Sequence, residues 1–162
     1  MRWIWIDRFD EFVPGQRAVA VKNVSLAEEH LHDHFPGYPL MPASLLVEGM
    51  AQTAGILVGE VRQFSEKVIL AKVKRATFHQ IVRPGDQVRH EAVIEQISAA
   101  AAATTGRIWR GQELIGEVDL VFSHIDQNLS GLEFPEENFV FTAQFLELLK
   151  TYRRNPTESI RL

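Results

Sequence analysis

The 162-residue chain contains no cysteine, which excludes disulfide bonds, thiolate metal sites and cysteine nucleophiles. It also lacks an excess of positive charge. Its 17 Lys and Arg residues against 21 Asp and Glu residues give a net charge of −4, which disfavours nucleic acid as a partner. No uncharged apolar run reaches the ~18 residues of a membrane span, and the N-terminus meets charge too early for a signal peptide. We therefore expect a cytoplasmic protein without a membrane span.

The composition itself is that of an ordinary globular protein, with 46% hydrophobic and 23% charged residues, and the length suits one domain with a real core. Residues 3–13 are rich in aromatic residues and isoleucine and end at a Pro-Gly turn, which predicts a strand paired with residues 17–24. Residues 27–41 are polar and then rich in Pro and Gly, so no regular element is expected there. Residues 44–61 are apolar on every face, which predicts a helix buried nearly all round.

The second half of the chain is dominated by strand patterns. Four strands are predicted, and the last places alternate apolar residues on one face. Their ranges are 67–78, 87–97, 101–110 and 113–123. A hairpin, one apolar helix and several antiparallel strands predict an α+β fold in which a sheet wraps around a single central helix.

The end of the chain changes character. Phe145, Leu148, Leu149 and Tyr152 recur at helical spacing, which predicts an amphipathic C-terminal helix. We divide the chain into a domain over residues 1–124 and an extension over residues 125–162, a loop and a helix that pack on the same domain or on a partner.

The residues that point to chemistry are His34 and Glu48. They lie fourteen positions apart, across a Pro- and Gly-rich turn and the start of the apolar segment. Burial raises the pKa of a carboxyl group, so a carboxyl in such a segment can act as an acid near neutral pH. Histidine supplies a base at the same pH. The pair predicts proton-transfer chemistry.

The stretch HFPGYPLMPASLLVEGMAQTAG at residues 34–55 resembles the signature of the 3-hydroxyacyl-(acyl carrier protein) dehydratases, the FabA/FabZ family of the hotdog fold. Ile6-Asp7-Arg8 and Arg83-Pro84-Gly85-Asp86 extend the resemblance over residues 3–123. It implies the removal of water from a 3-hydroxyacyl thioester to give a trans-2-enoyl thioester, in fatty-acid or related lipid biosynthesis. It implies no cofactor and no metal.

Carried over by position, the resemblance makes His34 the catalytic base and Glu48 the catalytic acid, the FabZ-type choice. The carbonyl of Leu40 falls where it holds the histidine ring. The N–H of Ala43 falls where the thioester oxygen binds, and Gln52 where a glutamine orders the site. Gly37 completes the predicted substrate-binding residues.

The resemblance also implies partners. Acyl carrier protein, or alternatively coenzyme A, would carry the substrate. The implied assembly is a homodimer, or a hexamer built as a trimer of dimers, with each site pairing His34 of one chain with Glu48 of the other.

The sequence departs from the family pattern at two places. Ala43 stands where glycine is usual and would be strained if that position needs a positive φ angle. Gly49 stands where alanine is common, which loosens the helix slightly.

Two other classes of function stay open. A hotdog thioesterase would hydrolyse the thioester, although such families generally lack this motif. A non-catalytic acyl-binding or assembly protein would keep the fold alone, although the presence of both His34 and Glu48 argues against it. A structural interpretation of Glu48 also remains, in which the carboxyl pairs with Arg75 or Arg107.

Two charged clusters have alternative interpretations. His30, His32 and His34 alternate, as zinc-binding histidines sometimes do, but the remaining histidines are scattered, so we expect no metal and place His30 and His32 at the surface. The basic residues Lys72, Lys74 and Arg75 form either a solvated face or a docking patch for an acidic carrier protein.

Overall fold

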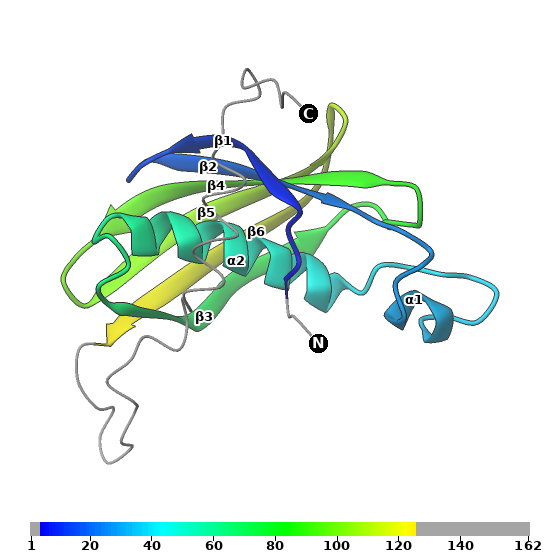
Figure 1. The fold of residues 1–162 in the computed structure, drawn as a ribbon, viewed down its shortest axis with the longest axis horizontal. Helices are drawn as coiled ribbons and strands as arrows, with labels where there is room; N and C mark the ends of the chain where they lie inside the picture. Colours follow the sequence, from blue (N-terminus) through cyan, green and yellow to red (C-terminus); the bar gives the residue numbers. More distant parts are fainter. Residues whose placement is uncertain (1–3, 126–162) are drawn as a thin grey trace, which may run out of the picture.

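The computed structural model describes residues 4–125 of the chain (Figure 1). The elements in chain order are β1 (Arg8–Val13), β2 (Arg17–Asn23), α1 (His30–Asp33), α2 (Ala43–Glu60), β3 (Lys67–Phe78), β4 (Gln87–Ile97), β5 (Ala101–Arg110) and β6 (Glu113–Ile125). The six strands form one sheet in the order β1-β2-β4-β5-β6-β3, and every neighbouring pair is antiparallel. Helix α2 lies along one face of this sheet, in its curve (Figure 1). The predicted α+β fold around one central helix is confirmed.

Helix α2 begins directly after Pro42, whose φ of −57° and ψ of 134° are not helical. The carbonyl of Pro42 accepts the N–H groups of Leu45 and Leu46, at 3.0 and 3.3 Å. All seven residues 53–59 are buried. The helix therefore has no solvent face in its C-terminal half, as its composition predicts, because strands β2 to β6 all contact it.

The strands complete the core with alternate residues. On β6, Gly116, Val118, Leu120 and Phe122 are buried, as their period of two predicts. Val118, Leu120 and Phe122 belong to the same buried cluster as Met50 of the helix. Burial of each large side chain is worth roughly 1.5–3 kcal/mol, so this interface holds helix and sheet together.

Two details differ from the sequence-based prediction, and one part of it is not tested. Strand β1 begins at Arg8 rather than at residue 3, and residues 4–7 run ahead of the ladder. The polar stretch expected to lack regular structure contains the four-residue helix α1. The predicted C-terminal helix, with most of the extension that carries it, lies outside the described residues.

Strand β3 is an edge strand, because β6 is its only neighbour in the described sheet. Its residues 70–77 are exposed, including Leu70 at 40% and Val73 at 42%. The Arg75 guanidinium donates hydrogen bonds to Asp119 at 2.9 Å and to Glu117 at 3.2 Å on β6. These pairs show that Arg75 is not a partner of Glu48.

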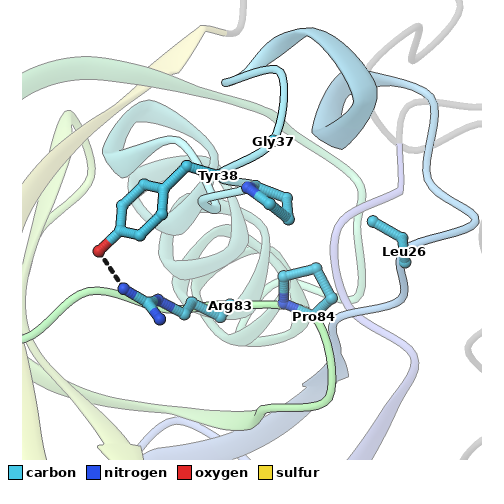
Figure 2. A pocket seen from close by; sticks show the side chains of 6 residues that line it. Leu26, Gly37, Tyr38, Arg83 and Pro84 are labelled. Atoms are coloured by element: carbon cyan, nitrogen blue, oxygen red, sulfur yellow. Dashed lines mark hydrogen bonds between the residues drawn. The ribbon is translucent and has the colours of Figure 1, made fainter.

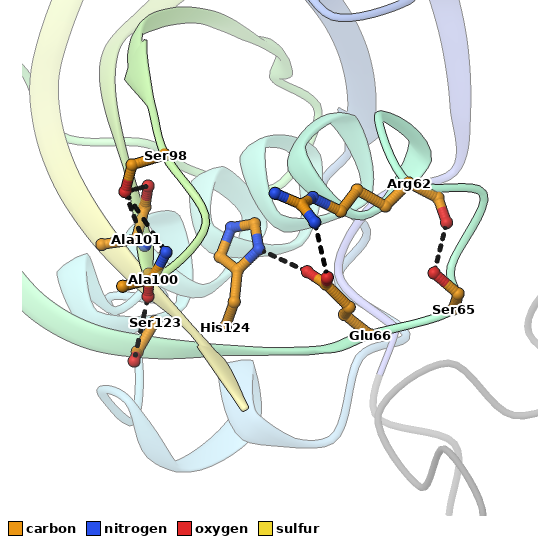
Figure 3. Close-up of polar contacts among 8 residues, drawn as sticks. All are labelled: Arg62, Ser65, Glu66, Ser98, Ala100, Ala101, Ser123 and His124. Atoms are coloured by element: carbon orange, nitrogen blue, oxygen red, sulfur yellow. Dashed lines mark hydrogen bonds and ion pairs between the residues drawn. The ribbon is translucent and has the colours of Figure 1, made fainter. Parts of the chain in front are cut away.

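Two histidines lie in the core. The side chain of His124 is 1% exposed, and its Nδ1 lies 2.7 Å from Oε2 of Glu66. Glu66 also accepts a hydrogen bond of 2.8 Å from Arg62 (Figure 3). This network ties the end of β6 to the segment that follows α2.

The other buried histidine, His90 on β4, has no polar partner for its Nδ1 among the residues described here. Burial lowers the pKa of His90 to about 4, from an ordinary value of 6.5. The unfolded chain therefore binds more protons between these two values, so stability falls as the pH drops from 6.5 to about 4.

We expect this histidine alone to remove about 3 kcal/mol of unfolding free energy across that window. Denaturant unfolding at pH 7, 5 and 4 measures the loss, and His90→Leu should reduce it. His79→Gln, at an exposed histidine, is the matched control and should keep the wild-type slope. An equal slope in all three proteins would contradict the assignment.

None of the helices in residues 4–125 is long and apolar enough to cross a membrane.

Candidate active site

The loop that carries His34 is closed by its own backbone. The N–H of Leu40 donates to the carbonyl of His34 at 2.8 Å, and Phe35 and Tyr38 exchange two backbone hydrogen bonds of 3.1 and 2.9 Å. Gly37 has a φ angle of +74°, in the left-handed region that favours glycine. Glycine is therefore favoured at position 37 because of the backbone conformation of the turn that positions His34.

The ring of His34 is oriented by the same loop. Its Nδ1 lies 2.8 Å from the carbonyl oxygen of Leu40, the contact that the motif predicts. A carbonyl only accepts hydrogen bonds, so Nδ1 carries the proton and the neutral ring leaves Nε2 unprotonated. The ring of Phe35 stacks on the imidazole, with 4.2 Å between centroids. This geometry presents Nε2 as a base.

The loop is also fastened to the turn between β3 and β4. The Met41 N–H donates to the Val82 carbonyl at 2.8 Å. Next to this bond, the Arg83 guanidinium lies 4.4 Å from the Tyr38 ring centroid and donates a hydrogen bond to the Tyr38 hydroxyl (Figure 2). Tyr38 and Arg83 line a cavity of about 270 Å³ with Gly37 and three apolar side chains. The turn between β3 and β4, far from the His34 loop in sequence, thus holds that loop in place.

Glu48 lies in the second turn of α2. Its apolar sequence surroundings predict an enclosed carboxyl, but the residue is only half-buried. Its Oε1 accepts a hydrogen bond of 2.9 Å from Nε2 of Gln52. The Gln52 carbonyl in turn accepts the backbone N–H of Trp5 at 2.8 Å. Because an N–H must meet the carbonyl end of the amide, the Trp5 contact fixes the orientation in which Gln52 donates to Glu48. The partner of Glu48 is therefore an amide, not Arg75 or Arg107.

Ala43 is the first residue of α2 and is exposed. The first N–H groups of a helix have no partner within it, and the positive end of the helix dipole lies there. Ala43 is not among the non-glycine residues with positive φ, so the alanine carries no strain from this source. Its N–H is placed to meet an oxygen with negative charge.

The structure brings some predicted residues together and keeps others apart. Leu40 meets His34, and Gln52 meets Glu48. No hydrogen bond or ion pair between His34 and Glu48 is present within the described chain. His34 and Glu48 of one chain are thus each held by a partner of their own, Leu40 and Gln52.

The metal interpretation finds no support in residues 4–125, where no group of three or more His, Cys, Asp or Glu residues is arranged to hold an ion. His32 is exposed, as predicted. His30 is half-buried instead, and desolvation lowers its pKa. The edge of its ring packs against Trp5, with 5.1 Å between centroids, so the prediction of a surface position for His30 was wrong.

Two supports of the site lie far from the motif in sequence. Trp5 contacts Gln52 across 47 positions of sequence, and Arg83 contacts Tyr38 across 45. No local pattern marks either pair, since both contacts form only when the sheet brings distant segments together. The aromatic residues near the N-terminus were the available signal, and they were assigned to a strand.

A sheet wrapped around one helix, with a fixed imidazole before the helix and a carboxyl in its second turn, defines a hotdog protein equipped for acid–base chemistry. Comparison with known proteins gives the particular family. The model of the FabA-like domain matches residues 3–119. The chain belongs to the FabA-like family.

Three relatives illustrate the similarity, and each is named 3-hydroxyacyl-(acyl-carrier-protein) dehydratase FabZ. The protein of Pelotomaculum thermopropionicum is 37% identical over 122 residues, which cover 75% of this chain and 87% of the relative. That of Symbiobacterium thermophilum is 38% identical over 125 residues, covering 76% and 88%. That of Ligilactobacillus salivarius is 43% identical over 93 residues, covering 57% and 66%.

Solved structures support the fold. A conserved protein of Pseudomonas aeruginosa aligns with a TM-score of 0.61 at 16% identity and covers 73% of this chain and 87% of its own. A thioesterase of Haemophilus influenzae aligns with a TM-score of 0.58 at 14% identity, covering 71% and 76%. At such identities the likeness concerns the fold alone.

Proposed function

We propose that this chain removes water from 3-hydroxyacyl thioesters of acyl carrier protein to give trans-2-enoyl thioesters, in the cytoplasm and in fatty-acid or related lipid biosynthesis. The observation that carries the proposal is the hydrogen bond between His34 Nδ1 and the Leu40 carbonyl. It leaves Nε2 free as a base, and the enoyl product requires the loss of a C2 proton. The names of the relatives support the same reaction.

In the proposed reaction His34 Nε2 takes the proton from C2, which the thioester carbonyl acidifies. Negative charge then develops on the thioester oxygen. The N–H of Ala43, at the start of an 18-residue helix, donates to that oxygen and benefits from the helix dipole. The C2 electron pair forms the C2=C3 double bond.

Glu48 is the proposed general acid on the other side of the bond. It gives its proton to the C3 hydroxyl, which leaves as water. Gln52 holds Oε1 of Glu48, so we assign the proton donation to Oε2. After turnover the proton on His34 returns to Glu48 through solvent, and both groups are reset.

We propose further that two copies of the chain share each site, with His34 from one and Glu48 from the other, in a homodimer or a trimer of dimers. The lack of any hydrogen bond or ion pair between the two groups within residues 4–125 supports this arrangement. So does the exposed edge strand β3, since unpaired strand edges are commonly covered by another chain. The predicted extension over residues 125–162 would then pack on its own domain or on the partner.

A turnover assay tests the function. The purified protein is incubated with 3-hydroxyacyl thioesters of several chain lengths, on acyl carrier protein and on coenzyme A, and the products are separated. We expect the trans-2-enoyl thioester and a preference for the carrier protein. Free acid as the product would identify a thioesterase instead. Tight binding without any product would identify an acyl-binding protein.

A further inference from the structure

Trp5 contacts both halves of the candidate site. It lies in the segment ahead of β1 and is half-buried. Its backbone meets the residue that holds the acid, and its ring meets the helix that leads into the base. Neither contact is part of the hydrogen-bond ladder of the sheet or of the cluster of buried apolar side chains.

The connection from Trp5 to Glu48, called the acid arm below, consists of two hydrogen bonds. The Trp5 N–H donates to Oε1 of Gln52 at 2.8 Å, and Nε2 of Gln52 donates to Oε1 of Glu48 at 2.9 Å. Loss of the first bond removes the contact that fixes which end of the Gln52 amide faces the carboxyl of Glu48. The orientation of Glu48 therefore depends on a main-chain atom of residue 5.

The connection from Trp5 to His34, called the base arm below, passes through helix α1. The Trp5 indole meets the His30 imidazole edge-on, at 5.1 Å between centroids and 75° between planes. The His30 carbonyl accepts the backbone N–H of His34 at 3.1 Å. Nε2 of His30 is buried and has no hydrogen-bond partner in residues 4–125, so this side of the ring is positioned by packing. Trp5 thus packs against the first residue of α1, whose carbonyl holds the backbone N–H of His34.

We infer that Trp5 is a positioning residue for both catalytic groups, acting on Glu48 through Gln52 and on His34 through His30. The inference rests on the proposed function. Where two chains share each site, His34 and Glu48 of one chain serve different sites. One tryptophan then supports the base of one site and the acid of the other, and its two contacts connect the two sites.

Two substitutions separate the contacts. Trp5→Ala removes the ring and keeps the N–H, whereas Trp5→Pro removes both. We expect kcat to fall about 10-fold in the alanine variant and up to about 100-fold in the proline variant, because small displacements of catalytic groups are costly. KM should change little, since the contacts do not touch substrate. Trp5→Phe, which retains a ring, should recover most of the alanine loss.

Gln52→Ala completes a double-mutant cycle with the substitutions at position 5, because it removes the acceptor without changing the backbone at position 5. In that background, proline at position 5 should cost no more than alanine, because the acceptor of the N–H is gone. Additive losses would overturn the acid arm. The same cycle is read by NMR from the Gln52 carboxamide signals, which should shift in Trp5→Pro and stay in place in Trp5→Ala.

Phe9→Ala is the matched control, because Phe9 is also half-buried, near the N-terminus and in an edge-on ring contact at 5.1 Å, with Phe12. It should lower the melting temperature and leave kcat unchanged. Equal kcat losses in Phe9→Ala and Trp5→Ala would overturn the base arm. An inactive wild-type protein would overturn the proposed function, whereas unmoved Gln52 signals in Trp5→Pro would overturn the inference on an active enzyme.

Discussion

Replacing His34 with alanine, or Glu48 with glutamine, is expected to lower dehydration about 10²–10⁴-fold in each case, because a positioned acid or base contributes that much. The double variant should be little worse than either single variant, since the pair acts as one unit. Turnover of a 3-hydroxyacyl thioester, with circular dichroism to check folding, measures the effect. Near wild-type turnover in either single variant would sink the mechanism.

Matched controls come from α1, which precedes His34, and from α2, which carries Glu48. His32→Ala replaces an exposed histidine of α1, and Glu60→Gln replaces a half-buried glutamate of α2. Neither residue lies in the proposed site, so both variants should keep their activity. If only the His34 and Glu48 variants lose activity, the loss reflects catalysis and not the removal of any histidine or glutamate from this part of the chain.

The same two inactive variants also test the shared site. In a mixed dimer of His34→Ala and Glu48→Gln chains, one of the two sites receives an intact base and an intact acid. Mixing should therefore restore activity, up to about half of the wild-type value per mixed dimer on this count. Subunit exchange is verified separately by mass spectrometry. Verified exchange without recovered activity would show that each chain builds its own site.

The second large effect concerns Gly49, where the family commonly has alanine. A Cβ atom at this position would lie 2.6 Å from Nε2 and 3.0 Å from Cε1 of His90. His90 is 1% exposed, so its ring has no open space to enter. Overpacking of a core costs about 1–3 kcal/mol, whereas alanine in place of glycine favours a helix by about 1 kcal/mol. We expect Gly49→Ala to lower the free energy of unfolding.

Gly55 is the control on the same helix. It is also buried, but a Cβ atom there would meet Phe122 at 3.4 Å, an ordinary contact. Gly55→Ala should therefore raise the free energy of unfolding. In a His90→Ala background the ring is gone, so Gly49→Ala should become stabilising as well. Denaturant unfolding of the wild type and these four variants measures these signs, and a stabilising Gly49→Ala in the wild-type background would contradict the clash.

Much of the fold follows from periodicity. The bounds of β3, β4 and β5 are those predicted, and α2 differs by one residue at each end. Strand and helix patterns are long in these elements, and turns mark their ends. Helix α1 escaped prediction because it has only four residues and no side-chain cap.

The site was predictable only in part, and mostly through its resemblance to the family. The motif named His34, Glu48 and their neighbours, yet their catalytic roles stay predictions. Sequence patterns gave no sign that His90 would press against Gly49, because that contact joins a strand to a helix through the core. The half-burial of Glu48 was missed for a similar reason, since an apolar run does not tell which residues face outward at the start of a helix.

The imidazole of His34 takes its direction from the main-chain oxygen of Leu40, and every amino acid has such an oxygen. Evolution is therefore free to exchange the half-buried side chain at position 40 without turning the base. An alanine scan would therefore not detect the part that Leu40 plays, because alanine at position 40 keeps the carbonyl that orients the imidazole.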